Sequence, residues 1–155
     1  MGNKKTCLKY IGPVRIGLAS ATCKSTPLPQ NYPKATYKLP LPKNKKENDD
    51  LVNFFRTQKI RTDGVPTVSK EYARYYFAID LNDVLTEGKF VTSDGQEPTY
   101  TNWKYPAPND KTKPGSFIGE DYVAVGTDGT YLKNGKWNDI NERFYIALIC
   151  QQECY

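Results

Sequence analysis

The chain between Trp103 and Asp139 reads WKYPAPNDKTKPGSFIGEDYVAVGTDGTYLKNGKWND, and our interpretation of the whole sequence starts from it. It contains three groups of side-chain oxygens: an Asn-Asp pair after a proline, a Glu-Asp pair after a glycine and an Asn-Asp pair after a tryptophan. Amide and carboxylate oxygens are the hard ligands that Ca²⁺ prefers. The stretch therefore predicts a calcium site that serves recognition rather than catalysis.

Length and composition predict a single domain over residues 1–155. Aromatic residues make up 13% of the chain, with 12 tyrosines, which favours strands and binding faces over a plain helical bundle. The chain has no histidine, which excludes histidine zinc sites and a Ser-His-Asp triad. We therefore expect a binding protein and not an enzyme.

The basic residues favour a solvated surface over a nucleic-acid partner. The net charge is +5, and many of the lysines fall early, including Lys43, Lys45 and Lys46. Such runs are usually solvated, and no nucleic-acid motif accompanies them. No apolar run approaches the roughly 20 residues of a membrane span, so we expect no membrane insertion.

The four cysteines lie at the two ends of the chain: Cys7, Cys23, Cys150 and Cys154. An even number of cysteines is typical of two disulfides in a secreted, extracellular protein. Three pairings are possible. If the last segment is a strand, Cys150 and Cys154 lie about 13 Å apart, which favours pairing between the two ends of the chain.

Local patterns predict helices followed by antiparallel strands, which is an α+β arrangement. We expect helices at residues 13–24 and 44–58 and strands at 7–10, 74–81, 89–93, 122–125, 136–140 and 144–150. Residues 25–42 and 100–119 have few periodic signals and are expected to be loops. The second of these is long enough to suggest a functional loop.

Ordered motifs over nearly the whole chain resemble the C-type lectin-like domain of the C-type lectin family, in its mannose-binding-protein-like carbohydrate recognition form. They are FAIDLND at 77–83, TEGKF at 86–90, TYTNW at 99–103, PND at 108–110, GED at 119–121, WND at 137–139 and ICQ at 149–151. The resemblance implies two helices, antiparallel strands and a long calcium-binding loop region. It also implies a Cys23–Cys150 disulfide, with Cys7–Cys154 as an additional bond between the termini.

The resemblance implies two calcium sites in the loops. The sugar-facing site would use Asn109, Glu120, Asn138 and Asp139, which would bind both the ion and the sugar hydroxyls. The auxiliary site would use Asp83, Glu87, Asp110 and Asp121, with the main chain of Glu120.

Ala107 departs from the pattern, because the sugar-binding families carry Glu or Gln at this position. An alanine offers no side-chain oxygen, and one lost charge-assisted contact costs about 1.5–3 kcal/mol. The residue that separates mannose from galactose specificity is therefore missing.

Three functions remain open at this point. The first is a calcium-dependent carbohydrate-binding lectin that recognises glycans or glycoconjugates, for which a homo-oligomer would supply avidity. The second is a C-type lectin-like module that binds a protein or a surface. The third is a carboxylate hydrolase, which the adjacency of Glu120 and Asp121 disfavours because the two carboxylates cannot flank a bond.

Overall fold

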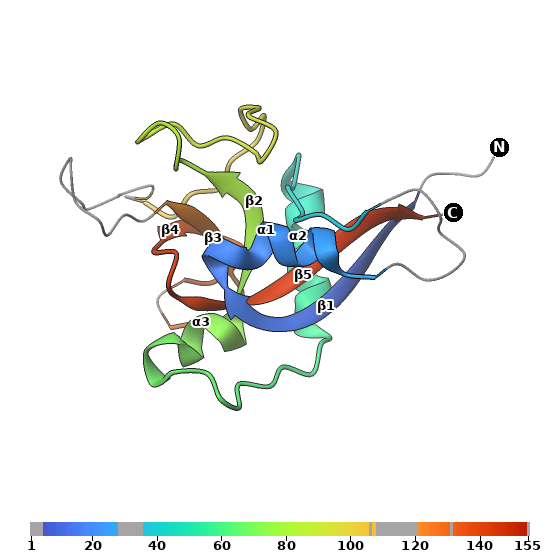
Figure 1. Ribbon diagram of the computed structural model, residues 1–155, viewed down its shortest axis with the longest axis vertical. Coiled ribbons are helices and arrows are strands. Elements are labelled where there is room, and N and C mark those ends of the chain that lie inside the picture. Colours follow the sequence, from blue (N-terminus) through green and yellow to red (C-terminus); the bar gives the residue numbers. More distant parts are fainter. Residues whose placement is uncertain (1–4, 28–35, 106, 108–120, 131, 155) are drawn as a thin grey trace.

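The computed structural model describes residues 5–27, 36–105, 107, 121–130 and 132–154, without the side chains of Lys5, Glu153 and Cys154. A five-stranded sheet with the order β1-β5-β2-β3-β4 forms the centre (Figure 1). Its strands are β1 (Lys5–Arg15), β2 (Tyr76–Asn82), β3 (Tyr122–Gly126), β4 (Trp137–Ile140) and β5 (Tyr145–Cys154). Neighbours are antiparallel except β2 and β5, which are parallel at Phe77 and Ala147.

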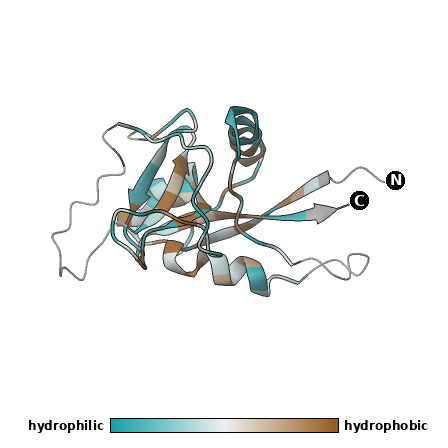
Figure 2. Ribbon diagram, turned by 90° about the horizontal axis from the view of Figure 1, so that it is seen from above, coloured by the Kyte–Doolittle hydropathy of each residue, from teal (hydrophilic) through white to brown (hydrophobic). Residues whose placement is uncertain are grey.

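Helices cover both faces of the sheet, which has a hydrophobic core on each side. The helices are α1 (Ala19–Ser25), α2 (Lys45–Arg56) and α3 (Lys70–Tyr75), with 3-10 turns at Ile16–Leu18 and Thr67–Ser69. Alternate residues of β5 point in opposite directions: Ile146 and Leu148 lie in the core beside α1, and Ala147 and Ile149 lie in the core beside α2. Figure 2 shows the sheet as a layer between α1 and α2. The α+β class is confirmed.

The sequence of α2 explains where this helix begins and which side it buries. The Asn44 side chain accepts a hydrogen bond from the Glu47 N–H at 2.8 Å, which caps the first turn. The buried residues Leu51, Val52 and Phe55 recur at helical spacing and contact the sheet. The helix predicted at 44–58 is therefore confirmed.

The helix predicted at 13–24 is wrong in its first three residues. β1 continues to Arg15, Pro13 pairs with Ala147, and helical structure starts only at Ile16. Pro13 cannot donate a ladder hydrogen bond, but β1 is an edge strand, where a missing donor is tolerated. The strand predicted at 7–10 is correspondingly too short.

The strand predicted at 74–81 begins with a helical turn instead, because α3 ends at Tyr75 and β2 starts at Tyr76. Tyr72 packs edge-on against Tyr76 and stacks on Phe144, so tertiary contacts hold Tyr72 in α3. The strand predicted at 89–93 is reduced to a single bridge between Val91 and Asn82.

The Cys23–Cys150 disulfide is confirmed, with the two Cα atoms 5.5 Å apart. Cys7 is also disulfide-bonded. Its predicted partner Cys154 lies beside Lys5 in the β1–β5 ladder, but the Cys154 side chain lies outside the described residues. Within the described ranges, no helix is long and apolar enough to cross a membrane.

Candidate metal centre and ligand site

The candidate site lies at one end of the sheet, where β2, β3 and β4 meet. β2 ends at Asn82, which pairs with Tyr122 at the start of β3, and Tyr122 pairs with Ile140 at the end of β4. The Asp83 N–H donates to the Asp121 carbonyl at 3.0 Å. The loops after β2 leave from this end (Figure 1). The topology therefore brings residues from distant parts of the chain together here.

Three carboxylates converge at this point. One oxygen from each of Asp83, Glu87 and Asp121 lies within 4.8 Å of the others. Asp83 is buried at 1% exposure, Asp121 is half-buried and Glu87 is exposed. Of the eight predicted metal ligands, the structure brings these three together. Asn109, Asp110 and Glu120 lie outside the described residues.

The loop after β2 is folded back so that Glu87 reaches Asp83. Oδ2 of Asp83 accepts a hydrogen bond from the Gly88 N–H at 2.9 Å, and the Lys89 N–H donates to the Thr86 carbonyl at 2.9 Å. Gly88 has φ +84°, a conformation that glycine adopts readily. The sequence TEGKF thus supplies the turn that closes the cluster.

The cluster suits a divalent cation. Oδ1 of Asp121 is buried and has no hydrogen-bond partner among the described residues. A buried carboxylate oxygen without a partner is costly, and a third nearby carboxylate adds repulsion. A Ca²⁺ ion accepts six to eight oxygens and would satisfy all three groups. Asp83, Glu87 and Asp121 therefore fit the predicted auxiliary calcium site.

The surrounding electrostatics are negative. Burial raises the pKa of the Tyr122 hydroxyl, and the carboxylates of Glu142 and Asp121 raise it further, because a phenolate would be repelled by both. Negative charge at this end of the sheet would favour a bound cation.

Asn138 and Asp139 lie on β4, outside the carboxylate cluster. Asp139 pairs with Val123 and is 1% exposed, whereas Asn138 pairs with Ala124 and is half-buried. Both belong to a regular strand, so their backbone is held by the β3 ladder. Among the described carboxylates, Asp139 is not part of the group formed by Asp83, Glu87 and Asp121.

Ala107 lies at the start of the long loop and is half-buried. Its N–H donates to the Lys104 carbonyl at 2.6 Å, and its methyl group offers no ligand oxygen. The departure seen in the sequence therefore falls on a residue whose backbone N–H is hydrogen-bonded within the described chain.

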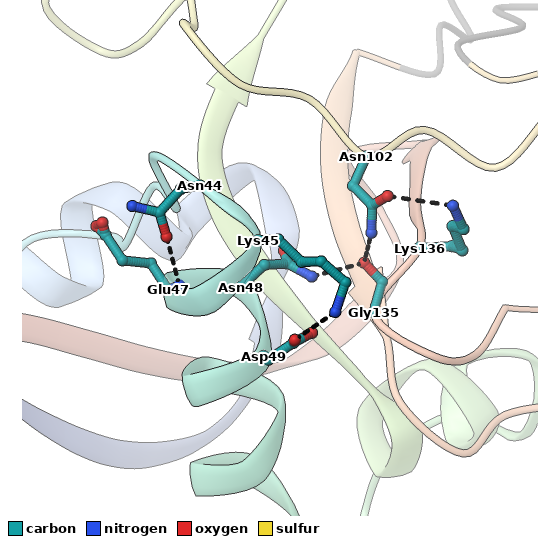
Figure 3. Close-up of polar contacts among 8 residues, drawn as sticks. All are labelled: Asn44, Lys45, Glu47, Asn48, Asp49, Asn102, Gly135 and Lys136. Carbon is teal, nitrogen blue, oxygen red and sulfur yellow. Dashed lines mark hydrogen bonds and ion pairs between the residues drawn. The ribbon is translucent and has the colours of Figure 1, made fainter.

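A polar network at the turn before β4 was not predicted from the sequence (Figure 3). Asn48 of α2 is buried at 1% exposure and bonds both Gly135 and Trp137. Asn102 donates to the same Gly135 carbonyl at 2.8 Å. A polar residue on a helix normally faces solvent, so no local signal marks Asn48; only its partners 87 and 89 residues away reveal its role.

Comparisons with known proteins agree with this fold, although no protein-family profile matches the chain. A tetranectin-like protein of Carcharhinus perezii is 40% identical over 75 residues, which are 48% of this chain and 39% of that protein. The chain therefore matches less than half of that relative's length.

Solved structures match over almost the whole chain. The C-type lectin CEL-I from Cucumaria echinata superposes with a TM-score of 0.68 and 17% identity, covering 97% of this chain and 92% of that one. The mouse scavenger receptor C-type lectin carbohydrate-recognition domain superposes with a TM-score of 0.66 and 18% identity, covering 100% and 94%. This chain therefore has the C-type lectin-like fold.

Proposed function

We propose that this domain is a calcium-dependent carbohydrate-binding lectin. The observation that carries the proposal is the convergence of Asp83, Glu87 and Asp121, with a buried and unpartnered oxygen on Asp121, at the loop end of a C-type lectin-like fold. We extend the auxiliary site to Asp110, as the sequence predicts. The domain would work outside the cell, where millimolar calcium and disulfides coexist.

The sugar would bind at Asn109, Glu120, Asn138 and Asp139. A bound Ca²⁺ would supply coordination positions for two neighbouring sugar hydroxyl oxygens. The carboxylates of Glu120 and Asp139 would accept the hydroxyl protons, and the amides of Asn109 and Asn138 would donate to the hydroxyl oxygens. Each hydroxyl would then have both its proton and its lone pairs satisfied, which is the basis of selectivity for sugars over water.

Two residues of the proposed sugar site, Asn138 and Asp139, would be held by the sheet. Asn138 and Asp139 belong to β4, and both residues are held in register with β3. Side chains on a strand keep their spacing better than side chains on a loop, so less conformational entropy is lost when a sugar binds. Single sites of this kind bind weakly, and a homo-oligomer would add avidity.

A second function, binding of a protein or surface ligand without sugar, is favoured by Ala107. The turn at Ala107 holds a methyl group where the sugar-binding families carry an oxygen ligand. This alternative keeps the auxiliary calcium site and removes only the sugar contact.

A glycan array in millimolar calcium distinguishes the two functions. We expect wild-type protein to bind a subset of glycans and Asp139→Ala to bind none, because Asp139 would hold both ion and hydroxyl. Asp63→Ala changes an exposed turn carboxylate and serves as the matched control. An empty wild-type array together with a tight protein partner in a pulldown supports the alternative, and full binding by Asp139→Ala shows that the assigned site is wrong.

A further inference from the structure

Asn48 is a buried side chain of α2 that contacts two points of the chain on either side of Lys136. Its Nδ2 donates to the Gly135 carbonyl at 3.0 Å (Figure 3). Its Oδ1 accepts a hydrogen bond from Nε1 of Trp137 at 2.8 Å. The side chain is 1% exposed. Both of its polar atoms are thus used inside the protein, which is the condition for burying an amide without penalty.

Gly135 is shaped to receive this contact. It has φ +78°, and a Cβ atom at this position would lie 2.7 Å from Nδ2 of Asn48. The same carbonyl also accepts from Asn102 at 2.8 Å, and Oδ1 of Asn102 accepts a hydrogen bond from Nζ of Lys136 at 3.2 Å. One carbonyl therefore connects α2, the loop after residue 99 and the turn before β4.

Trp137 transmits this arrangement to the strand. Its side chain is fully buried and meets Tyr100 and Trp103 edge-on, with ring centroids 5.7 and 5.8 Å away. Its backbone N–H donates to the Asn102 carbonyl at 2.9 Å. The indole is thus fixed both by packing and by the hydrogen bond to Asn48, and the next residues in the chain are Asn138 and Asp139.

We propose that Asn48 is a positioning residue for the ligand site, which sets the place of Asn138 and Asp139 by holding Gly135 and Trp137. This inference rests on the proposed function, because it assigns these two residues to the bound sugar. Asparagine is the side chain that meets both needs. It offers a donor for the carbonyl and an acceptor for the indole N–H, whereas Asp offers only acceptors and Leu offers neither.

The test uses Asn48→Asp and Asn48→Leu with the best glycan from the array, at saturating calcium. We expect affinity to fall on the order of tenfold for each variant, as is usual when a group that orients a ligating residue is lost. Leu148→Ala is the control, because it opens the core beside α1, on the other side of the sheet. At a temperature where circular dichroism shows every protein folded, Leu148→Ala should keep wild-type affinity.

A second readout does not depend on sugar. In ¹⁵N-labelled Asn48→Asp, we expect the Asn138 side-chain amide and the Asp139 backbone amide to shift, while signals of α1 and β1 stay in place. If wild-type protein binds no glycan, the proposed function fails and these resonances still decide the positioning role. Unchanged affinity and unmoved resonances in folded Asn48→Asp would overturn the inference.

If the Asn48 variants do not fold, a variant of Asn102, the other donor to the Gly135 carbonyl, tests the same inference. Asn102→Ala removes a half-buried donor to Gly135 and leaves Asn48 in place. We expect a smaller shift of the same Asn138 and Asp139 resonances. If they stay unmoved, the Gly135 carbonyl does not set the strand and the inference is overturned.

Discussion

Asp121→Asn should change stability in opposite directions with and without calcium. The substitution keeps the shape of the side chain and removes one of three carboxylates whose oxygens lie within 4.8 Å of one another. Without calcium, the loss of a negative charge relieves repulsion. With calcium, the loss of a ligand weakens binding, so stabilisation by the ion is reduced.

The two effects can be sized separately. Coulomb's law gives about 3 kcal/mol for two unit charges 4.8 Å apart at an effective dielectric constant of about 20. Water around the exposed Glu87 screens its share, so we expect a gain of about 1 kcal/mol without calcium. Calcium at 100 times its Kd stabilises the wild type by about 2.7 kcal/mol. For a domain of this size that is about 5–11 °C in Tm.

The assay is differential scanning calorimetry in EDTA and in millimolar calcium. We expect the Tm of Asp121→Asn to lie about 2–4 °C above the wild-type Tm in EDTA and several degrees below it in calcium. Asp63→Asn alters an exposed carboxylate in a turn and should match wild type in both buffers. A drop of equal size in both buffers would refute a metal role for Asp121 and indicate a structural one.

Three further predictions concern the framework. Gly135→Ala should destabilise the domain by more than Gly64→Ala. Both glycines have φ +78°, but only at Gly135 would the added Cβ meet Asn48. Equal free energies of urea unfolding for the two variants would contradict this. Replacing both Cys23 and Cys150 by Ala should lower the free energy of unfolding by about 5 kcal/mol for a loop of 127 residues, measured from urea midpoints; a loss below about 1 kcal/mol would show that the bond is dispensable. Burial raises the pKa of the Asp80 carboxyl above its ordinary value of 3.8, so the protonated form stabilises the fold below pH 3.8 and this stabilisation is lost as pH rises through the raised pKa. Asp80→Asn should remove this part of the dependence of unfolding free energy on pH. A variant with the same pH dependence as wild type would exclude the effect.

Features encoded within a few residues could be predicted from the sequence. Helix α2 shows its start in Asn44 and Glu47 and its buried side in Leu51, Val52 and Phe55, so local chemistry and packing agree. The cluster of Asp83, Glu87 and Asp121 could be predicted only through the ordered motifs, because Asp121 lies 34 residues beyond Glu87 in the chain. The topology of β2 and β3 is what brings these residues together.

Features set by distant pairing could not be predicted. Pro13 resembles the start of a helix, yet pairing with Ala147 keeps it in β1. Arg74 and Tyr75 fall in the segment predicted as a strand, yet they end α3, where Tyr72 stacks on Phe144. Asn48 resembles a solvent-facing helix residue, and its burial follows from Gly135 and Trp137. In each case a tertiary contact decides against the local preference.

The most direct test of the central claim is a glycan array probed three times with the same protein: in millimolar calcium, in excess EDTA, and after calcium is restored. We predict binding to a subset of glycans that disappears in EDTA and returns with calcium, because the oxygen ligands at the loop end need the ion to hold sugar hydroxyls. Glycan binding that persists unchanged in EDTA would contradict the account.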